Sequence, residues 1–225
     1  MSEIDKFRQQ ASLESAGSSS DEILNSILER ISRYQKSTDQ SLIDIGCGKG
    51  DLLSKVKDIA PNLKLTGVDY THFEGDKPFE FFTYDCNKDF SDTFQRYDLT
   101  VASEVIEHLE NPRHFLRQLS KITASGGHII LSTPNPDSLT SLISLCLRGY
   151  HSAFGPKDYP AHITVVSSYD LLHVVNENDS HLRLKEVHFI QNGRIPGSST
   201  KWRQILPTLK GSRFSDNYLV VLQKI

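Results

Sequence analysis

The feature that most limits how this chain can fold is an apolar run that ends in a glycine-rich turn, LIDIGCGKGD at residues 42–51. A helix-like segment follows the turn, and further short β-like runs alternate with helix-like segments along the chain. This alternation favours right-handed crossovers and a mostly parallel, doubly wound sheet with helices on both faces. The pattern predicts seven strands, at Ser41–Ile45, Lys64–Asp69, Glu80–Tyr84, Tyr97–Ala102, His128–Ser132, Arg183–Gln191 and Tyr218–Leu222.

The other segments indicate one domain with an arm and an insertion. With 37% hydrophobic residues, the 225-residue chain has enough apolar material for a core, and no linker divides it. Residues 1–20 are polar and Ser-rich, and we expect a mobile N-terminal arm there. We expect Asp21 to cap the next helix, so that residues 21–225 form a single domain. Prolines and glycines break the alternation at residues 134–160, which predicts an inserted lid.

Charge and cysteine content limit the class of protein. The net charge of −3 argues against a non-specific nucleic-acid binder. Three scattered cysteines, Cys47, Cys86 and Cys146, make no disulfide framework or zinc motif and suit a reducing compartment. The polar N-terminus predicts no secretory signal, and the longest apolar stretch is far short of the ~20 residues that a membrane span needs. We therefore expect a cytoplasmic protein without a transmembrane segment.

One region departs from this acidic balance. Residues 181–225 carry eight basic and two acidic side chains. Such a region is either a solvated face or a surface that meets an anionic substrate or lipid headgroup. Within it, we expect Arg194 or Arg203 to meet an anionic group of the substrate.

The glycine-rich turn predicts a ligand site. In an open α/β sheet, ligands bind at the carboxyl ends of the strands, and glycine lets them touch the main chain. Asp44 stands just before Gly46 and Gly48, where it would repel phosphate but suit an ammonium group. Asp69 ends the second strand and can accept hydrogen bonds from a ribose diol. With Asp85 placed to meet an adenine amino group, the expected ligand contains an amino acid, a ribose and an adenine but no phosphate.

These motifs, in this order, carry a resemblance. DIGCGKG (44–50), GVD (67–69), YD (84–85) and YD (97–98) together resemble the class I S-adenosylmethionine-dependent methyltransferases. The resemblance implies a Rossmann-like α/β fold, a single methyltransferase domain and S-adenosyl-L-methionine as cofactor. The cofactor-binding residues that we predict are Asp44, Gly46, Cys47, Gly48, Asp69, Tyr70, Asp85, Cys86 and Ser103.

An acidic–histidine cluster follows the fourth predicted strand, in SEVIEHLENP at residues 103–112. If this segment is helical, Glu104, Glu107 and His108 stand at i, i+3 and i+4 on one face. Two carboxylates and an imidazole are suitable ligands for a divalent metal such as Mg²⁺, Mn²⁺ or Zn²⁺. The same residues can instead line the pocket and touch the cofactor, or His108 can act as a lone general base. We predict all three as catalytic residues.

A second resemblance favours the metal. EVIEH is similar to the Glu-x-x-Glu-His element of ubiquinone-type O-methyltransferases and of the enzymes that methylate the 2′-hydroxyl at the 3′ end of small RNAs. In the RNA family a further histidine, before a Thr/Ser-led helix, completes the metal site, and His162 stands in that position here. The resemblance thus implies a metal site of Glu104, Glu107, His108 and His162. His162 can also be a loop histidine that hydrogen-bonds the backbone.

The predicted function is S-adenosylmethionine-dependent O-methylation of a hydroxyl on a small molecule or glycan, assisted by a metal. Three alternatives stay open. They are terminal RNA 2′-O-methylation, metal-independent N- or C-methylation, and a non-catalytic methyltransferase-like subunit. The net charge opposes the first, and the intact cofactor motif opposes the last. The sequence names neither the acceptor nor the oligomeric state.

The lid insertion, residues 134–160, is expected to build the acceptor pocket. Its apolar stretch Leu139–Leu147 has two interpretations. It packs as part of the lid, or it forms an amphipathic element that makes peripheral contact with a membrane.

Overall fold

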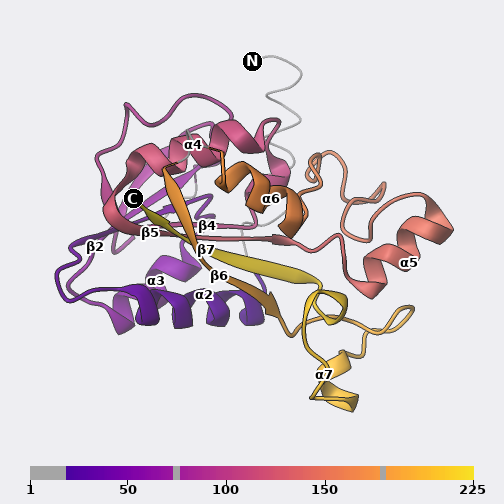
Figure 1. Cartoon of the computed structure of the whole chain (residues 1–225). Helices are drawn as coiled ribbons and strands as arrows, with labels where there is room; N and C mark the ends of the chain where they lie inside the picture. Colours follow the sequence, from indigo (N-terminus) through magenta and orange to yellow (C-terminus); the bar gives the residue numbers. More distant parts are fainter. Residues whose placement is uncertain (1–18, 73–76, 178–180) are drawn as a thin grey trace.

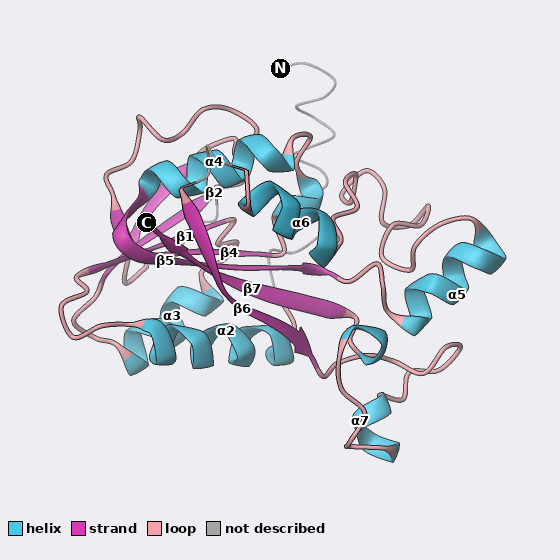
Figure 2. Ribbon diagram, in the orientation of Figure 1, coloured by secondary structure: helices cyan, strands magenta, loops and turns pink. Residues whose placement is uncertain are grey.

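A seven-stranded sheet forms the centre of the molecule (Figures 1 and 2), in a computed structural model that describes residues 19–72, 77–177 and 181–225. The strand order is β3-β2-β1-β4-β5-β7-β6. β1 to β5 pair in parallel, and β7 runs antiparallel to both of its neighbours. The strands are β1 (Ser41–Ile45), β2 (Lys64–Asp69), β3 (Glu80–Thr83), β4 (Tyr97–Ser103), β5 (Thr123–Pro134), β6 (Leu182–Ile190) and β7 (Asn217–Lys224). The predicted Rossmann-like, mostly parallel sheet of seven strands is confirmed.

Helices cover both faces of this sheet (Figure 2). α2 (Asp21–Tyr34) and α3 (Asp51–Ile59) lie on one face, and α4 (Pro112–Ile122) and α6 (Ser168–Val175) lie on the other. Each face has its own hydrophobic cluster, as expected for strands that are buried on both sides. These two clusters hold the carboxyl ends of the strands in fixed positions.

The start of α2 differs by one residue from the prediction. Ser20, not Asp21, is the N-cap: its backbone is extended and its hydroxyl accepts from the Ile23 N–H at 3.5 Å. Asp21 lies in the first helical turn, where its charge suits the positive end of the helix dipole. Of the predicted arm, only Ser19 and Ser20 belong to the described residues.

β5 extends beyond the predicted His128–Ser132 at both ends, and it runs through Gly126 and Gly127 at its start. A Cβ atom on Gly127 would lie 2.6 Å from the Asp98 carbonyl oxygen. Glycine therefore allows β5 to approach β4 closely at a point where the register shifts.

The strand order reverses between β1 and β4, so the loops that follow these two strands separate and leave a crevice. All five residues of β1 are buried, including Asp44. The glycine-rich turn after β1 and the residues after β4 therefore face each other across the crevice.

The predicted insertion and the late basic segment lie together at one end of the molecule (Figure 1). α5 (Leu139–Arg148) belongs to the first, and α7 (Trp202–Ile205) and the short 3₁₀ turn η3 (Ser212–Phe214) belong to the second. The Thr140 hydroxyl donates to the Arg194 carbonyl oxygen at 2.7 Å, and Arg213 donates to that of Asp137 at 2.7 Å. Within the described chain, no helix combines the length and the apolar character needed to cross a membrane.

Candidate active site

A pocket of about 570 Å³ opens at the carboxyl ends of β1, β2 and β4. Among the predicted cofactor residues, those that line it are Asp44, Gly46, Cys47, Asp69, Tyr70, Asp85, Cys86 and Ser103. Gly48 does not line the pocket. It lies in the turn beside the pocket, and its N–H donates to the Asp69 carboxylate. Glu104, His108 and His162 also line it, whereas Glu107 is fully buried behind the wall.

The glycine-rich turn is pressed against the residues that follow β4. Gly46 has a φ of 77°, and a Cβ atom there would lie 2.3 Å from Val105 Cγ2. The N–H groups of Gly46 and Cys47 both donate to the Val68 carbonyl oxygen, at 2.7 and 3.0 Å. The turn therefore has one position, in which only glycine fits at residue 46.

Asp69 is fixed by backbone donors. Its two carboxylate oxygens accept from the N–H groups of Gly48 at 2.8 Å and Thr71 at 2.9 Å. The side chain is 7% exposed and lines the pocket. These bonds hold a charged acceptor in the wall before any ligand arrives.

Asp44 presents a buried oxygen in the same wall. Among the described residues, its Oδ1 has no hydrogen-bond partner. Burial, and then the charge of Asp69, raises the pKa of Asp44 well above its usual range. A buried acceptor of this kind is costly unless a ligand satisfies it, and an ammonium group fits that need.

The pocket has a wall that the sequence did not predict. Ser19, Ser20, Ile23 and Leu24 close one side of it, and the Ser19 and Ser103 hydroxyls lie 3.0 Å apart. Spacing identifies Ile23 and Leu24 as the apolar face of a helix, but nothing in it says that the helix begins over a pocket.

Three of the four predicted metal ligands come together. Single ligand atoms of Glu107, His108 and His162 all lie within 4.8 Å of one another, and His108 Nε2 is 4.0 Å from Glu107 Oε1. Nδ1 of His108 lies 2.8 Å from the Ala161 carbonyl oxygen, and Nδ1 of His162 lies 2.6 Å from that of Ala153. Because a carbonyl only accepts, each Nδ1 carries the proton and each Nε2 offers its lone pair.

The electrostatics of this cluster suit a cation. Burial lowers the pKa of both histidines, so their imidazoles are neutral at pH 7. The Thr133 hydroxyl donates to Glu107 Oε2 at 2.9 Å, and no described residue hydrogen-bonds to Oε1. Burial also raises the pKa of Glu107. Two neutral imidazoles and one buried carboxyl with an unpartnered oxygen form a donor set that fits a divalent ion such as Zn²⁺ or Mn²⁺.

The fourth predicted ligand, Glu104, lies outside this cluster. The helical face expected for residues 103–110 is wrong, since the only helical turn there is the 3₁₀ turn η1 (Ile106–His108). The Glu104 N–H donates to the Ser132 carbonyl oxygen at 3.1 Å, which extends the pairing of β4 with β5 by one hydrogen bond. The φ of 55° at Glu104 lies in the left-handed region, outside the α-helical range. Its carboxylate accepts from the Ser132 hydroxyl at 2.9 Å and from Asn217 Nδ2 at 2.6 Å.

The two arginines expected to meet an anionic acceptor do not line the pocket. Arg194 pairs with Asp216 at 2.7 Å, and Arg203 pairs with Glu22 at 2.9 Å. The structure therefore assigns both charges to ion pairs within the chain.

Comparison with known proteins gives one family and several relatives. Residues 18–182 match the model of a family described as a methyltransferase domain. The ubiquinone biosynthesis O-methyltransferase of Rickettsia bellii is 28% identical over 170 residues, which cover 68% of this chain and 68% of that protein. The mitochondrial ubiquinone biosynthesis O-methyltransferase of Arabidopsis thaliana is 33% identical over 104 residues, or 41% of this chain and 32% of that protein. A malonyl-[acyl-carrier protein] O-methyltransferase of Paenibacillus sp. is 24% identical over 162 residues, which cover 65% of this chain and 57% of that protein.

Solved structures share the fold. A S-adenosylmethionine-dependent methyltransferase from Archaeoglobus fulgidus matches with a TM-score of 0.60 and 20% identity over 89% of this chain and 94% of that one. The plantazolicin methyltransferase BpumL, in complex with a triazolic desmethylPZN analog and SAH, matches with a TM-score of 0.66 and 20% identity. The match covers 96% of this chain and 90% of that one.

Proposed function

Because the chain belongs to the methyltransferase-domain family and is a class I S-adenosylmethionine-dependent methyltransferase, we propose that it methylates a hydroxyl oxygen with the help of a divalent metal ion. The acceptor is a small molecule or glycan, and adjacent hydroxyls suit it best. Relatives named as O-methyltransferases support oxygen as the acceptor atom. The observation that carries the proposal is the cluster of Glu107, His108 and His162 at the pocket wall.

The cofactor is assigned along the pocket from β1 to β3. The unpartnered oxygen of Asp44 receives the ammonium group, and the Gly46–Gly48 turn packs on the methionine part. Asp69, which backbone donors hold in place, binds the ribose hydroxyls. Asp85 and Cys86 flank the adenine. Ser103 and Glu104 line the same pocket, where they would face the reactive end of a cofactor bound in this order.

The metal is held by the Glu107 carboxylate and the Nε2 atoms of His108 and His162. When bound, a divalent ion lowers the pKa of a hydroxyl that it coordinates and orients it. Thr133 holds the Glu107 carboxylate, and the backbone carbonyls at residues 153 and 161 keep both imidazoles in the ligating tautomer.

Methyl transfer requires that the acceptor oxygen is aligned with the methyl carbon and that a base accepts the hydroxyl proton. The acceptor oxygen forms a bond to the methyl carbon as the carbon–sulfur bond breaks, and S-adenosylhomocysteine remains. We assign the hydroxyl proton to the carboxylate of Glu104, which lines the pocket and is oriented by Ser132 and Asn217. Holding the reacting atoms in line is expected to supply several kcal/mol of the barrier reduction.

The acceptor enters over the lid. Tyr159, Pro160 and Ile163 line the pocket across from the cofactor residues, and Tyr159 is 69% exposed. The last two residues of the predicted lid and the three residues after it therefore form the acceptor side of the site, and residues 134–158 do not line the pocket. The cytoplasmic location stays a prediction, consistent with free cysteines at all three positions.

Calorimetric titration of Mg²⁺, Mn²⁺ and Zn²⁺ into the S-adenosylhomocysteine-saturated protein tests the proposal. We expect one saturable site for at least one ion, with affinity at least ~100-fold lower in His162→Ala because a direct ligand is lost. His173→Ala, at an exposed histidine of α6, is the matched control and should bind like the wild type. Equal metal affinity in His162→Ala, with cofactor binding intact, would contradict the metal assignment.

A further inference from the structure

α5 buries two serines and exposes three of its apolar side chains. Ser141 and Ser144 are its buried residues: the Ser141 hydroxyl bonds His151 Nδ1 at 3.0 Å, and the Ser144 hydroxyl donates to the Tyr150 carbonyl oxygen at 2.8 Å. The exposed residues of the helix include Ile143, Leu145 and Leu147, at 40%, 39% and 80% exposure. Ile143 and Leu147, four positions apart, share the outer face, and Leu145 lies on the opposite flank. Apolar side chains exposed on a helix indicate a surface that meets an apolar environment.

A second pair of exposed apolar side chains lies at the same end of the molecule. Ile205, the last residue of α7, is 59% exposed and Leu206 after it is 49% exposed. Figure 2 shows α5 and α7 projecting from this end of the sheet. The hydrogen bonds from Thr140 to Arg194 and from Arg213 to Asp137 join the two segments. The two apolar groups therefore belong to segments that are fastened to each other at this end of the molecule.

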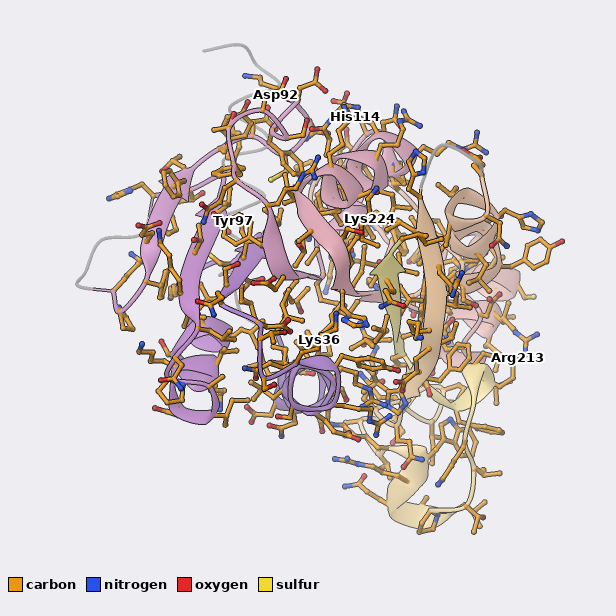
Figure 3. All side chains as sticks on the ribbon, turned by 60° about the vertical axis from the view of Figure 1, so that its left-hand side comes forward. Lys36, Asp92, Tyr97, His114, Arg213 and Lys224 are labelled. Carbon is orange, nitrogen blue, oxygen red and sulfur yellow. The ribbon has the colours of Figure 1, made fainter. Side chains whose placement is uncertain are left out.

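The charge around these apolar residues is positive, and four basic side chains remain after Asp216 and Glu22 are paired. Residues 134–160 and 191–215 together contain seven basic side chains and two acidic ones. Three of the basic residues are engaged in ion pairs within the chain. The others, all exposed, are Arg148, Lys157, Lys210 and Arg213, the last of which is labelled in Figure 3. Both acidic residues, Asp137 and Asp158, are partly buried.

We propose that this region, which we name the α5–α7 surface and define as the exposed side chains of residues 143–148 and 203–213, docks on an anionic lipid bilayer. Leucine and isoleucine enter the boundary between headgroups and acyl chains, while lysine and arginine neutralise the anionic headgroups. α5, at ten residues, is about 15 Å long and lies along the interface instead of crossing it.

The composition of the surface favours a bilayer over the other occupants. A nucleic acid would engage the cations but leave the outward leucines in water. A symmetric contact with a second copy would set like charges against each other. Only a surface that is both apolar and anionic satisfies both features. This proposal does not rest on the proposed acceptor or metal.

Sedimentation with lipid vesicles tests the proposal on the full chain. We expect the protein to pellet with vesicles of phosphatidylcholine and phosphatidylglycerol and not with phosphatidylcholine alone. Raising the salt should weaken the binding. The double variant Ile143→Glu/Leu147→Glu places two carboxylates in the outer face of α5 and should reduce the bound fraction about tenfold. Ile59→Glu, at a 50% exposed position on α3, is the matched control and should bind like the wild type.

Two results would overturn the proposal. The first is a wild type that stays in the supernatant with anionic vesicles, whether or not it binds single-stranded RNA or forms a dimer instead. The second is a double variant that pellets as well as the wild type. Binding of S-adenosylhomocysteine by each variant shows that it is folded, and it also separates a failure here from a failure of the methyltransferase assignment.

Discussion

The cofactor side and the acceptor side of the pocket are built in different ways. On the cofactor side, backbone N–H groups and a left-handed glycine hold Asp69 and the turn after β1 in place, directly at strand ends. On the acceptor side, residues 149–163, of which the last five line the pocket, and the supporting residues 191–215 form loops and short turns. Large apolar side chains such as Tyr159 remain exposed there. The difference teaches that backbone hydrogen bonds between adjacent strand ends determine the first side, whereas the second depends on loop contacts and on what it binds.

The proposed metal cluster lies where the two sides meet. Glu107 and His108 follow β4, and His162 comes from the acceptor loop. The N–H groups of Ile163 and Thr164 both donate to the Glu107 carbonyl oxygen at 3.0 Å. These two bonds bring the acceptor loop to the cofactor side and place the two histidine rings 4.8 Å apart, between centroids.

The largest effect is expected from adding a methyl group to the glycine turn. Gly46→Ala drives a Cβ into Val105 at a φ of 77° and should lower S-adenosylhomocysteine affinity at least ~100-fold, or about 2.7 kcal/mol. Gly149→Ala, with a φ of 82° and no atom within 4 Å of the added Cβ, lies on the acceptor side. It should leave cofactor affinity unchanged in the same calorimetric titration. An equal loss of S-adenosylhomocysteine affinity in both variants would contradict the conclusion that the cofactor side alone is held rigidly for cofactor binding.

A smaller loss is expected when Asp44 loses its charge. Asp44→Asn should weaken S-adenosylhomocysteine binding roughly 10- to 100-fold, because an ammonium group loses its buried ionic partner. The pKa of Asp44 is raised by burial and by Asp69, and the ammonium group binds only the ionised form. Wild-type affinity should therefore fall as the pH decreases through this raised pKa, while the affinity of Asp44→Asn stays flat. A pH-independent wild type would show that Asp44 does not face the ammonium group.

Next comes the hydroxyl that orients Glu107. Thr133→Val removes the 2.9 Å hydrogen bond at nearly constant volume and should lower metal affinity about tenfold. Thr66→Val is the matched control, since the buried Thr66 hydroxyl has no partner among the described residues. It should bind metal like the wild type. If Thr133→Val also binds metal normally, Glu107 is not a ligand.

The smallest effect concerns an ion pair that joins the two sides. The hydrogen bond from Lys201 lowers the pKa of Glu22, and the charges of Lys201 and Arg203 lower it further. Burial opposes this shift only in part. Because the folded pKa is lowered, this stabilisation is present above the ordinary value of 4.5 and is lost as the pH falls through the folded pKa.

Glu22→Gln should therefore lower the free energy of unfolding by about 0.5 kcal/mol at pH 7 and by less in acid. Urea titration at both pH values measures this. The control is Glu80→Gln in the exposed pair with Lys64, which should change stability by close to zero. A loss for Glu22→Gln that is the same at both pH values would contradict the ionic origin.

Much of the fold was predictable because its elements are strongly periodic. The bounds of β1 and β2 match the predicted segments, since each is a short apolar strand with clear ends. The predicted cofactor residues line or support one pocket because parallel strands end at the same edge.

The rest depends on contacts that spacing does not encode. The break in the helical pattern at Glu104 comes from its pairing with Ser132, 28 positions away. The orientation of the two histidines comes from the carbonyls of Ala153 and Ala161, which have no side-chain signature. The inverted burial of α5 opposes the usual rule that apolar residues face the core, so the pattern alone left its packing open.

The most direct test of the metal-assisted transfer is a measurement of how close the metal lies to the transferred methyl group. S-adenosylmethionine labelled with ¹³C at the methyl carbon is bound to the protein, and its resonance is followed as Mn²⁺ is added. Mn²⁺ held by Glu107, His108 and His162 should broaden the methyl signal strongly, and His162→Ala should abolish the broadening at the same Mn²⁺ concentration. A methyl signal that stays sharp while calorimetry shows bound Mn²⁺ would mean that the metal and the methyl group do not share one site.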